Sequence, residues 1–467
     1  MPGSPSRQPS ANRIGRATRT AITKFLDLFP HATRREPTIA RGRDAGHSHP
    51  PSTSPLASTR SRPVRVALYS HDTVGLGHMR RNLLIARTLA SSDLQPVILM
   101  IAGGREAALF TIPPGVDCLT LPALQKDTGG HYRSRHLNVS LNHLIALRAR
   151  TIRAVLEEFE PDVLIVDKVP RGAVRELDPS LELLHERGRT RCVLGLRDVL
   201  DHAGAVHREW SSDSNVKAVR NYYDAVWVYG DPRVYDSVRE YRFPAEVAGK
   251  VRYTGYLGQR APSAYPDGRP DSLPSVPKGP LILCLVGGGQ DGARLSEAFA
   301  EARLPPGTTG LILTGLFMPK ELQTHVRRSA TSNPGVSVLG FVPDPYALLR
   351  QADRIVAMGG YNTVCEVLSF EKQALIVPRV DPRREQLIRA ERMRDLGLLD
   401  VLHPDRLSPD ALTEWLARPK ATPPRPRDLI DLDGLERLPR LLEEVLGDAT
   451  HTAESVRHEG ALQHVAG

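Results

Sequence analysis

Short hydrophobic runs alternate with helix-like patterns along most of the chain. Apolar runs of strand length, such as residues 64–69 and 96–101, are separated by stretches such as 80–90, in which apolar positions recur at helical spacing. This alternation is typical of parallel sheets whose strands are connected by helices. The pattern therefore predicts an α/β protein.

The hydrophobic runs form two series, which predicts two doubly wound, Rossmann-like domains that face each other across a cleft. The first series covers residues 63–258 and the second covers 280–428. Between them, residues 259–279 contain five prolines and no apolar run, as expected of a linker. An amphipathic helix over 429–447 should close the folded part, and residues 448–467 should be frayed. Doubly wound sheets bind ligands beyond the carboxyl ends of their strands, so we expect the site in the cleft.

Positive charge is concentrated in residues 1–62, which are rich in Arg, Ser, Pro and Thr. Eleven Lys and Arg against three acids give this segment a net charge of +8, out of +9 for the whole chain. We predict a disordered basic tail and a folded body of nearly neutral charge, which disfavours nucleic-acid binding. The same charge would attract the tail to an anionic membrane.

Cysteine spacing and hydropathy bear on the location of the protein. The four cysteines lie at least 74 positions apart, so no two of them have the spacing of a metal site. No apolar stretch approaches the ~18 residues that a membrane span needs. We therefore expect a cytoplasmic protein, peripheral on the inner face of the membrane where the tail binds lipid.

Two glycine-rich turns follow expected strands and precede expected helices. The first contains Gly75, Gly77 and His78, and the second, residues 286–294, has the spacing G-x-G-x-x-G. Such glycines let a ligand approach the backbone, and the helix start behind them attracts an anion, although a tight turn needs no ligand. The second turn lacks the acidic residue about 20 positions later that a dinucleotide site uses, and no Gly-Lys-Ser/Thr follows it. These absences disfavour NAD binding and a Walker loop.

A third glycine turn, residues 358–366, follows the expected strand 355–357. Thr363 and Glu366 have the spacing of a capping box, an explanation that requires no ligand. Two glycines before a helix start are also compatible with an anion site. The polar segment 377–390 enters another helix at the same sheet edge.

These residues resemble glycosyltransferase family 28, the group that includes MurG of peptidoglycan synthesis. The similarity rests on residues 340–353, on Gly359-Gly360-x-x-Thr363-x-x-Glu366, and on the helix start at Glu385-Gln386. The first two glycine turns resemble the family's glycine-rich loops. The resemblance implies a GT-B fold and an inverting transfer of a hexose or N-acetylhexosamine from a nucleotide-diphosphate donor, usually a UDP-sugar. The acceptor would be a hydroxyl of a glycan or lipid-linked glycan, as in cell-envelope synthesis.

The resemblance also implies roles for individual residues. Phe341 and Val342 would flank the base, and Glu366 would accept hydrogen bonds from the ribose. Helix N-termini and arginine can stabilise a departing diphosphate without a metal, so no cofactor is expected. The other implied donor contacts are Gly288, Gly289, Gln290, Gly359, Gly360 and Thr363 near the diphosphate, and Glu385 and Gln386 at the sugar, with Gly75 and Gly77 as a phosphate loop of the first domain. The sequence departs from the family pattern in having Tyr361-Asn362 in the third turn and Arg379, Arg383 and Arg384 before Gln386, which would add phosphate contacts or select a different sugar.

An inverting transfer needs a base that deprotonates the acceptor hydroxyl, and this base should belong to the first domain. His78 is the first candidate because an imidazole with an ordinary pKa of about 6.5 is competent near pH 7. Asp72 and Asp198 are its rivals, and His78 has two alternatives, a hydrogen bond to the diphosphate and a structural role. A nucleotide-sugar epimerase, or a non-catalytic nucleotide-sugar or nucleic-acid binding protein, would be the alternative function.

Overall fold

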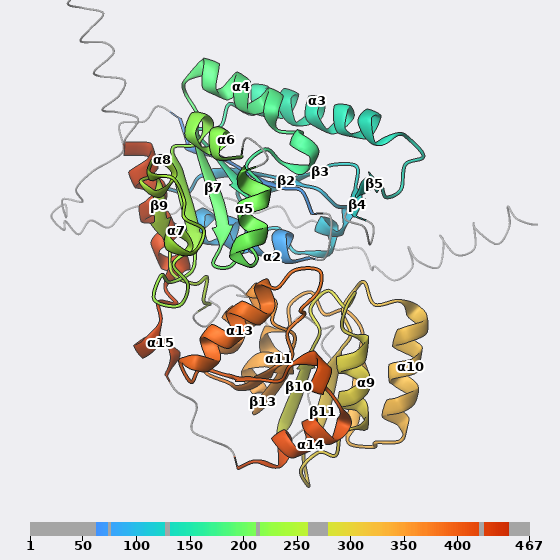
Figure 1. The fold of residues 1–467 in the computed structure, drawn as a ribbon. Coiled ribbons are helices and arrows are strands. Elements are labelled where there is room, and N and C mark those ends of the chain that lie inside the picture. Colours follow the sequence, from blue (N-terminus) through green and yellow to red (C-terminus); the bar gives the residue numbers. More distant parts are fainter. Residues whose placement is uncertain are drawn as a thin grey trace, which may run out of the picture. The chain divides into compact units, whose positions relative to one another are not determined.

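The fold contains two parallel sheets, each covered by helices (Figure 1). The computed structural model describes residues 62–72, 76–126, 131–211, 215–259, 279–419 and 425–447, all within one compact unit. The predicted basic tail, apart from Arg62, and most of the predicted linker lie outside the described residues, as does the segment 448–467. The α/β architecture expected from the hydrophobic pattern is confirmed.

The first sheet has seven parallel strands in the order β3-β2-β1-β6-β7-β8-β9. The direction in which the chain adds strands reverses between β1 and β6, which makes this pair the topological switch point. A small antiparallel hairpin, β4 and β5, lies apart from the sheet. The strands are β1 (Arg65–Ser70), β2 (Val97–Ala102), β3 (Val116–Thr120), β4 (Leu124–Lys126), β5 (Tyr132–Ser134), β6 (Val163–Asp167), β7 (Arg191–Arg197), β8 (Ala225–Tyr229) and β9 (Val251–Tyr253). The helices are α2 (Gly77–Ala90), α3 (Leu141–Phe159), α4 (Asp178–Arg187), α5 (Ala203–Ser211), α6 (Asn215–Tyr222), α7 (Ser237–Glu240) and α8 (Ala245–Ala248), with short 3-10 turns at Arg105–Leu109 and Ala173–Arg175.

The second sheet has six parallel strands in the order β12-β11-β10-β13-β14-β15. Its switch point lies between β10 and β13, so the turns after these two strands flank the same crevice. The strands are β10 (Leu281–Leu285), β11 (Thr309–Leu313), β12 (Val336–Leu339), β13 (Arg354–Ala357), β14 (Gln373–Ile376) and β15 (Asp400–Val401). The helices are α9 (Ala293–Glu301), α10 (Lys320–Thr331), α11 (Tyr346–Gln351), α12 (Tyr361–Ser369), α13 (Glu385–Asp395), α14 (Pro409–Ala417) and α15 (Pro426–Leu429), with a 3-10 turn at Pro404–Arg406.

The central strands are buried along their whole length. Every residue of β6, β8 and β10 is buried, and β1 is buried from Val66 onward. Because helices cover both faces of such a sheet, its central strands read as continuous apolar runs rather than as alternating patterns. This is why short hydrophobic runs located the strands in the sequence.

The last helix covers residues 434–447, a narrower range than the sequence suggested. The expected single helix from 429 is wrong at its start, because α15 ends at Leu429 and Asp433 forms a β-bridge with Leu257. Leu438 and Leu442 of the last helix are fully buried, in the same hydrophobic cluster as Val66 of β1. Arg437 of this helix donates to the carbonyl of Thr254, directly after β9, so the end of the described chain lies beside the first sheet.

Candidate active site

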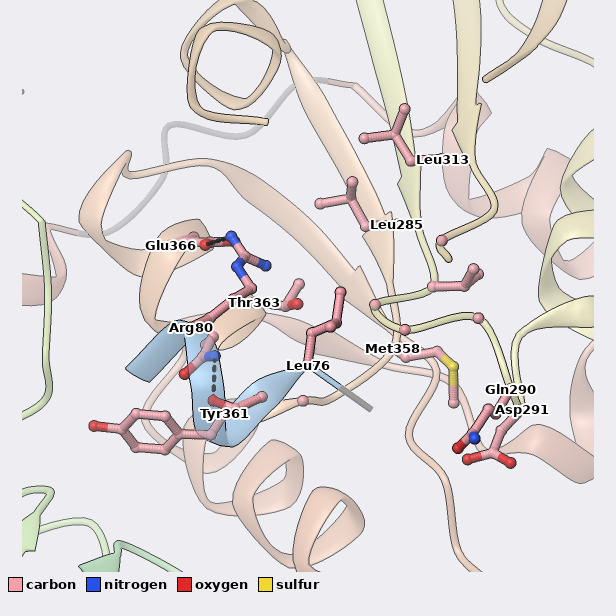
Figure 2. Close-up of a pocket in the computed structure, with 18 of the residues that line it drawn as sticks. Leu76, Arg80, Leu285, Gln290, Asp291, Leu313, Met358, Tyr361, Thr363 and Glu366 are labelled. Atoms are coloured by element: carbon pink, nitrogen blue, oxygen red, sulfur yellow. Dashed lines mark hydrogen bonds and ion pairs between the residues drawn. The ribbon is translucent and has the colours of Figure 1, made fainter. Parts of the chain in front are cut away.

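Turns from both sheets line one cavity (Figure 2). The turn after β1 contributes the start of α2, the turn after β10 contributes residues 286–291, and the turn after β13 contributes the start of α12. All three follow strands at the two switch points, where doubly wound sheets bind ligands. The cavity lining includes the following residues singled out from the sequence: Gly77, His78, Gly288, Gly289, Gln290, Phe341, Val342, Gly360, Thr363, Glu366, Arg379, Glu385 and Gln386.

Other candidate residues do not line this cavity. Gly359 packs against the start of α13, since an added Cβ would lie 3.2 Å from Gln386 Cβ. Asp72 is buried, and its Oδ2 accepts hydrogen bonds from Ser70 Oγ at 2.5 Å and from the Gly103 amide at 3.0 Å. Gly75 lies outside the described residues.

Asp198, a candidate base, is fully buried in an ion pair with Arg389 of α13. Arg389 Nη2 lies 2.6 Å from Asp198 Oδ1, and Arg389 Nε lies 2.8 Å from Oδ2. The Tyr256 hydroxyl donates to the same carboxylate at 3.1 Å. Both oxygens are therefore engaged between the two sheets, away from the cavity lining.

The turn after β10 requires glycine for its own packing. Gly289 has φ +92°, in the left-handed region, and an added Cβ would lie 2.1 Å from the Thr314 carbonyl oxygen. An added Cβ at Gly292 would lie 2.2 Å from Val286 Cβ. Glycine thus allows the backbone of this turn to pack closely against neighbouring residues. Gly288 and Gly289 line the cavity.

The turn after β13 corrects the capping-box interpretation. Helix α12 begins at Tyr361 with Gly360 as its N-cap, and no side chain caps it. Thr363 therefore lies inside the first turn and Glu366 in the second, where a capping box cannot form. Thr363 and Glu366 are both buried, and both line the cavity.

Glu366 forms an ion pair with Arg80 of helix α2, which packs on the first sheet. Arg80 Nη2 lies 2.6 Å from Glu366 Oε1, and Figure 2 shows this arginine reaching the carboxylate. Burial raises the pKa of Glu366, and the positive charge of Arg80 opposes that shift. Arg80, which comes from the other sheet, therefore favours the charged carboxylate against the effect of burial.

Tyr361 and Asn362, the first two residues of α12, contact α2 directly. The Arg81 guanidinium lies 5.8 Å from the centre of the Tyr361 ring, and Arg389 lies 5.5 Å from it on α13. Asn362 Nδ2 donates to the Gly77 carbonyl at 3.0 Å. Tyr361 and Asn362 therefore hold the first and third glycine turns together.

His78 contacts an acidic residue that the sequence reasoning missed. His78 Nδ1 lies 2.5 Å from Oδ2 of Asp167, the last residue of β6. Arg81 Nη2 lies 2.6 Å from each oxygen of the same carboxylate. Burial raises the pKa of Asp167, but Arg81 and His78 outweigh it and hold that pKa well below its usual range. Asp167 is therefore a fixed negative charge beside His78.

This contact defines which nitrogen of His78 is free. A proton must lie between a ring nitrogen and a carboxylate oxygen at this distance, so Nδ1 carries the hydrogen and Nε2 keeps its lone pair. Burial lowers the pKa of His78, although Asp167 opposes the shift. The neutral imidazole at the cavity wall is thus prepared to accept a proton.

In sequence, the chain is similar to proteins named as glycosyltransferases and to an N-acetylglucosamine transferase. No protein-family model matches the chain. An uncharacterized glycosyltransferase of Methanosarcina acetivorans is 22% identical over 317 residues, covering 65% of this chain and 77% of the relative. The UDP-N-acetylglucosamine--N-acetylmuramyl-(pentapeptide) pyrophosphoryl-undecaprenol N-acetylglucosamine transferase of Phenylobacterium zucineum is 26% identical over 183 residues. That match covers 37% of this chain and spans half the length of the relative.

Solved structures share the fold. LpCGTa in complex with UDP has a TM-score of 0.51 at 16% identity, covering 83% of this chain and 100% of that one. The UDP-GlcNAc 2-epimerase from Neisseria meningitidis has a TM-score of 0.52 at 13% identity, covering 82% and 99%. The protein is a glycosyltransferase with the GT-B fold.

The described residues of this glycosyltransferase contain neither a metal-binding cluster nor a helix that could span a membrane. Within the described ranges, no three His, Cys, Asp or Glu side chains gather in a way that could hold a metal ion. Asp431 and Asp433, which form a D-x-D string, pair with Arg437 and Arg427. Among the helices of the described residues, none has both the length and the apolar character needed to cross a membrane.

Proposed function

We propose that this glycosyltransferase moves a hexose or N-acetylhexosamine from a UDP-sugar to a hydroxyl of a glycan or lipid-linked glycan, with inversion at the anomeric carbon. The observation that carries the proposal is that His78, held by Asp167, lines the same cavity as the glycine turns of the second sheet. The N-acetylglucosamine transferase of Phenylobacterium supports the choice of donor and acceptor, since its name specifies a UDP-sugar and an undecaprenol-linked acceptor. Membership of glycosyltransferase family 28 is part of this proposal.

The donor would lie along the turns of the second sheet. Phe341 and Val342, both partly buried, would flank the base, and the free oxygen of Glu366 would accept from the ribose. The diphosphate would lie near Gly288, Gly289, Gln290, Gly360, Thr363 and Arg379, and the sugar near Glu385 and Gln386, with Gly77 facing them from the first sheet.

His78 would act as the base. As the acceptor oxygen bonds to the anomeric carbon and the bond from that carbon to the diphosphate breaks, the hydroxyl proton passes to His78 Nε2. Asp167 would orient the ring and stabilise the imidazolium that forms. The departing UDP would carry away the negative charge, stabilised by helix starts and Arg379 without a metal or other cofactor. Asp72 and Asp198 are less suitable because neither lines the cavity.

The basic segment at residues 1–62 would determine where the enzyme acts. The basic residues of 1–62 would hold the enzyme on anionic lipid at the cytoplasmic face of the membrane, near a lipid-linked acceptor. The remainder of the chain is nearly neutral in net charge, which does not favour nucleic acid as a partner.

Incubation of the full chain with a panel of nucleotide sugars tests this proposal. We expect one UDP-sugar to raise the thermal unfolding temperature, and UDP to be released faster when a hydroxyl acceptor is added. An epimerase would interconvert the free UDP-sugar without any acceptor. Epimerised donor in the absence of acceptor, or no stabilisation by any UDP-sugar, would contradict the proposal.

A further inference from the structure

Arg81 is a buried arginine of α2 that lies one helical turn after His78. Both residues line the cavity, although the side chain of Arg81 is only 2% exposed. Residues three positions apart are neighbours on one face of a helix, so Arg81 and His78 face the same part of the first sheet. That part is the end of β6, where Asp167 lies. Both side chains reach the carboxylate of Asp167.

The Arg81 guanidinium holds both oxygens of the Asp167 carboxylate. Arg81 Nη2 lies 2.6 Å from Oδ1 and 2.6 Å from Oδ2, and Arg81 Nε lies 3.2 Å from Oδ1. Oδ2 is also the oxygen that His78 Nδ1 contacts at 2.5 Å. Arg81 Nη2 and His78 Nδ1, which are 3.1 Å apart, are therefore two donors that converge on one oxygen. The carboxylate cannot turn away from the His78 ring without losing its bonds to Arg81.

Two tyrosines fix the guanidinium in turn. Arg81 Cζ lies 6.0 Å from the ring centre of Tyr229, the last residue of β8, and 5.8 Å from that of Tyr361, the first residue of α12. A cation over an aromatic ring is stabilised most where water is excluded, as it is here. The position of Arg81 is therefore set by a strand of the first sheet and by a helix of the second.

The Arg81–Asp167 ion pair is almost fully removed from water, with each side chain 2% exposed. An ion pair buried in this way adds little net stability, because removing two charges from water offsets most of their attraction. Apolar side chains of similar volume are often as stable at such positions. Fold stability therefore does not account for the pair, whereas its contact with His78 gives it a part in the chemistry.

Charged and titratable groups surround the His78 ring. Burial has the largest effect on the pKa of His78 and lowers it; Asp167 opposes this shift, and the charges of Arg81 and Lys168 add to it. The ring of His71, 5.0 Å from that of His78, is kept neutral because burial lowers its pKa well below the usual range. The groups are Arg81 of α2, Asp167 and Lys168 at the end of β6, His71 and Asp72 after β1, and, from the cavity lining, Arg197 of β7 and Tyr361 of α12. Among them, Arg81 is the cation that binds the same carboxylate as His78.

We propose that Arg81 is a positioning residue of the reaction: its guanidinium fixes the Asp167 carboxylate against His78 Nδ1 and keeps the ring uncharged until the acceptor gives up its proton. This inference rests on the proposed transferase function and adds a residue to it. When the acceptor proton reaches His78 Nε2, the ring becomes a cation that Asp167 stabilises. Arg81 keeps Asp167 an anion at that moment, so the proton on Nδ1 stays on the ring. Without Arg81, the ring beside Asp167 would already be protonated at a higher pH and could not accept the acceptor proton.

NMR titration of the histidine rings in the labelled full chain, without substrate, measures the effect of Arg81 on His78 directly. The His78 signal is assigned by its absence from the spectrum of His78→Gln. We expect Arg81→Gln to raise the pKa of His78 by about one pH unit or more, because Asp167 then acts on the ring unopposed. Arg81→Lys keeps the positive charge and should leave this pKa closer to the wild-type value. Arg87→Gln is the matched control: Arg87 belongs to the same helix but donates to the Thr111 carbonyl at 2.8 Å, so its loss should not change the pKa.

The pH profile of kcat gives a second measurement, which a purely structural arginine would not change. In Arg81→Gln, kcat should begin to decrease at a higher pH than in the wild-type protein, in step with the pKa of His78, while UDP affinity stays unchanged.

An unchanged His78 pKa in a folded Arg81→Gln protein would overturn the inference. So would a loss of UDP affinity that matches the loss of kcat, since it would assign Arg81 to the donor, or failure of both Arg81→Gln and Arg81→Lys to fold, since it would assign Arg81 to the structure. Absence of transfer by the wild-type protein would instead contradict the proposed function, because the pKa of His78 is measured without substrate.

Discussion

Arg80 Nη2 lies 2.6 Å from Glu366 Oε1, so a helix of the first sheet contacts the carboxylate that we assign to the donor ribose. Glu366 has two oxygens, and this contact leaves one for a ligand. Asn362 and Tyr361 make further contacts between α12 and α2 in the same turn. The donor cavity is therefore assembled by both sheets, although the ribose, base and diphosphate are assigned to the second.

Replacement of Glu366 by alanine should weaken UDP binding by about 1.5–3 kcal/mol, the range of a hydrogen bond to a charged group. No helix cap is lost, because Gly360 is the N-cap of α12 and Glu366 makes no capping bond. Calorimetry gives the UDP affinity, and thermal unfolding checks the fold. Arg80→Ala is the matched control: it breaks the same ion pair but keeps the carboxylate, so it should weaken binding much less. Equal UDP affinity in a folded Glu366→Ala protein would remove the ribose assignment.

Turnover should fall on the acid side of neutrality. The base form of His78 is the neutral ring, and burial lowers its pKa below the ordinary 6.5. Activity should therefore be fully present at pH 7 and be lost as the pH decreases through a value below 6.5, when Nε2 becomes protonated. The pH profile of kcat measures this. A kcat that already decreases with falling pH above pH 7 would be inconsistent with a buried, neutral His78.

Replacement of Asp198 by asparagine should reduce stability rather than act on the chemical step. The substitution leaves Arg389 buried without its charge partner, and breaking a buried ion pair in this way costs about 3–5 kcal/mol. Denaturant unfolding of the variant measures the loss. An Asp198→Asn protein of unchanged stability but abolished turnover would restore Asp198 as a candidate base.

Removal of residues 1–62 should leave turnover on a water-soluble acceptor unchanged. The segment carries eleven of the basic residues, each worth ~1 kcal/mol near an anionic surface. Co-sedimentation with vesicles containing anionic lipid should decrease on truncation, and the wild-type binding should weaken as salt is added. Vesicles of neutral lipid are the control. Lost turnover on the soluble acceptor would show that the segment contributes to catalysis.

Much of the architecture could be predicted from the sequence, since strands such as β6 and β10 are uninterrupted apolar runs buried on both faces. Strands with few buried positions were missed. β3 has no fully buried residue, and β15 is two residues long, so neither leaves a clear hydrophobic pattern. The last helix was placed too early because Leu432 continues its apolar spacing, although Asp433 pairs with Leu257 instead.

The candidate site was predictable where its residues lie in one short segment. The glycine turns near Gly288 and Gly360 could be found because spacing within a turn is visible in the sequence. Asp167 could not be linked to His78 in the same way, since 89 positions separate them and only the adjacency of β1 and β6 brings them together. The signal available was an apolar strand that ends in an acid at the switch point.

We propose His78 as the base of a UDP-sugar transferase. It is tested most directly by UDP release from the stabilising UDP-sugar with acceptor, measured for wild type and His78→Ala alongside the UDP affinity of both proteins. We expect kcat to fall by ~10²–10⁴ while UDP affinity stays unchanged, because a base acts on the acceptor in the transition state. An unchanged kcat, or a loss of UDP affinity that matches the loss of rate, would contradict it.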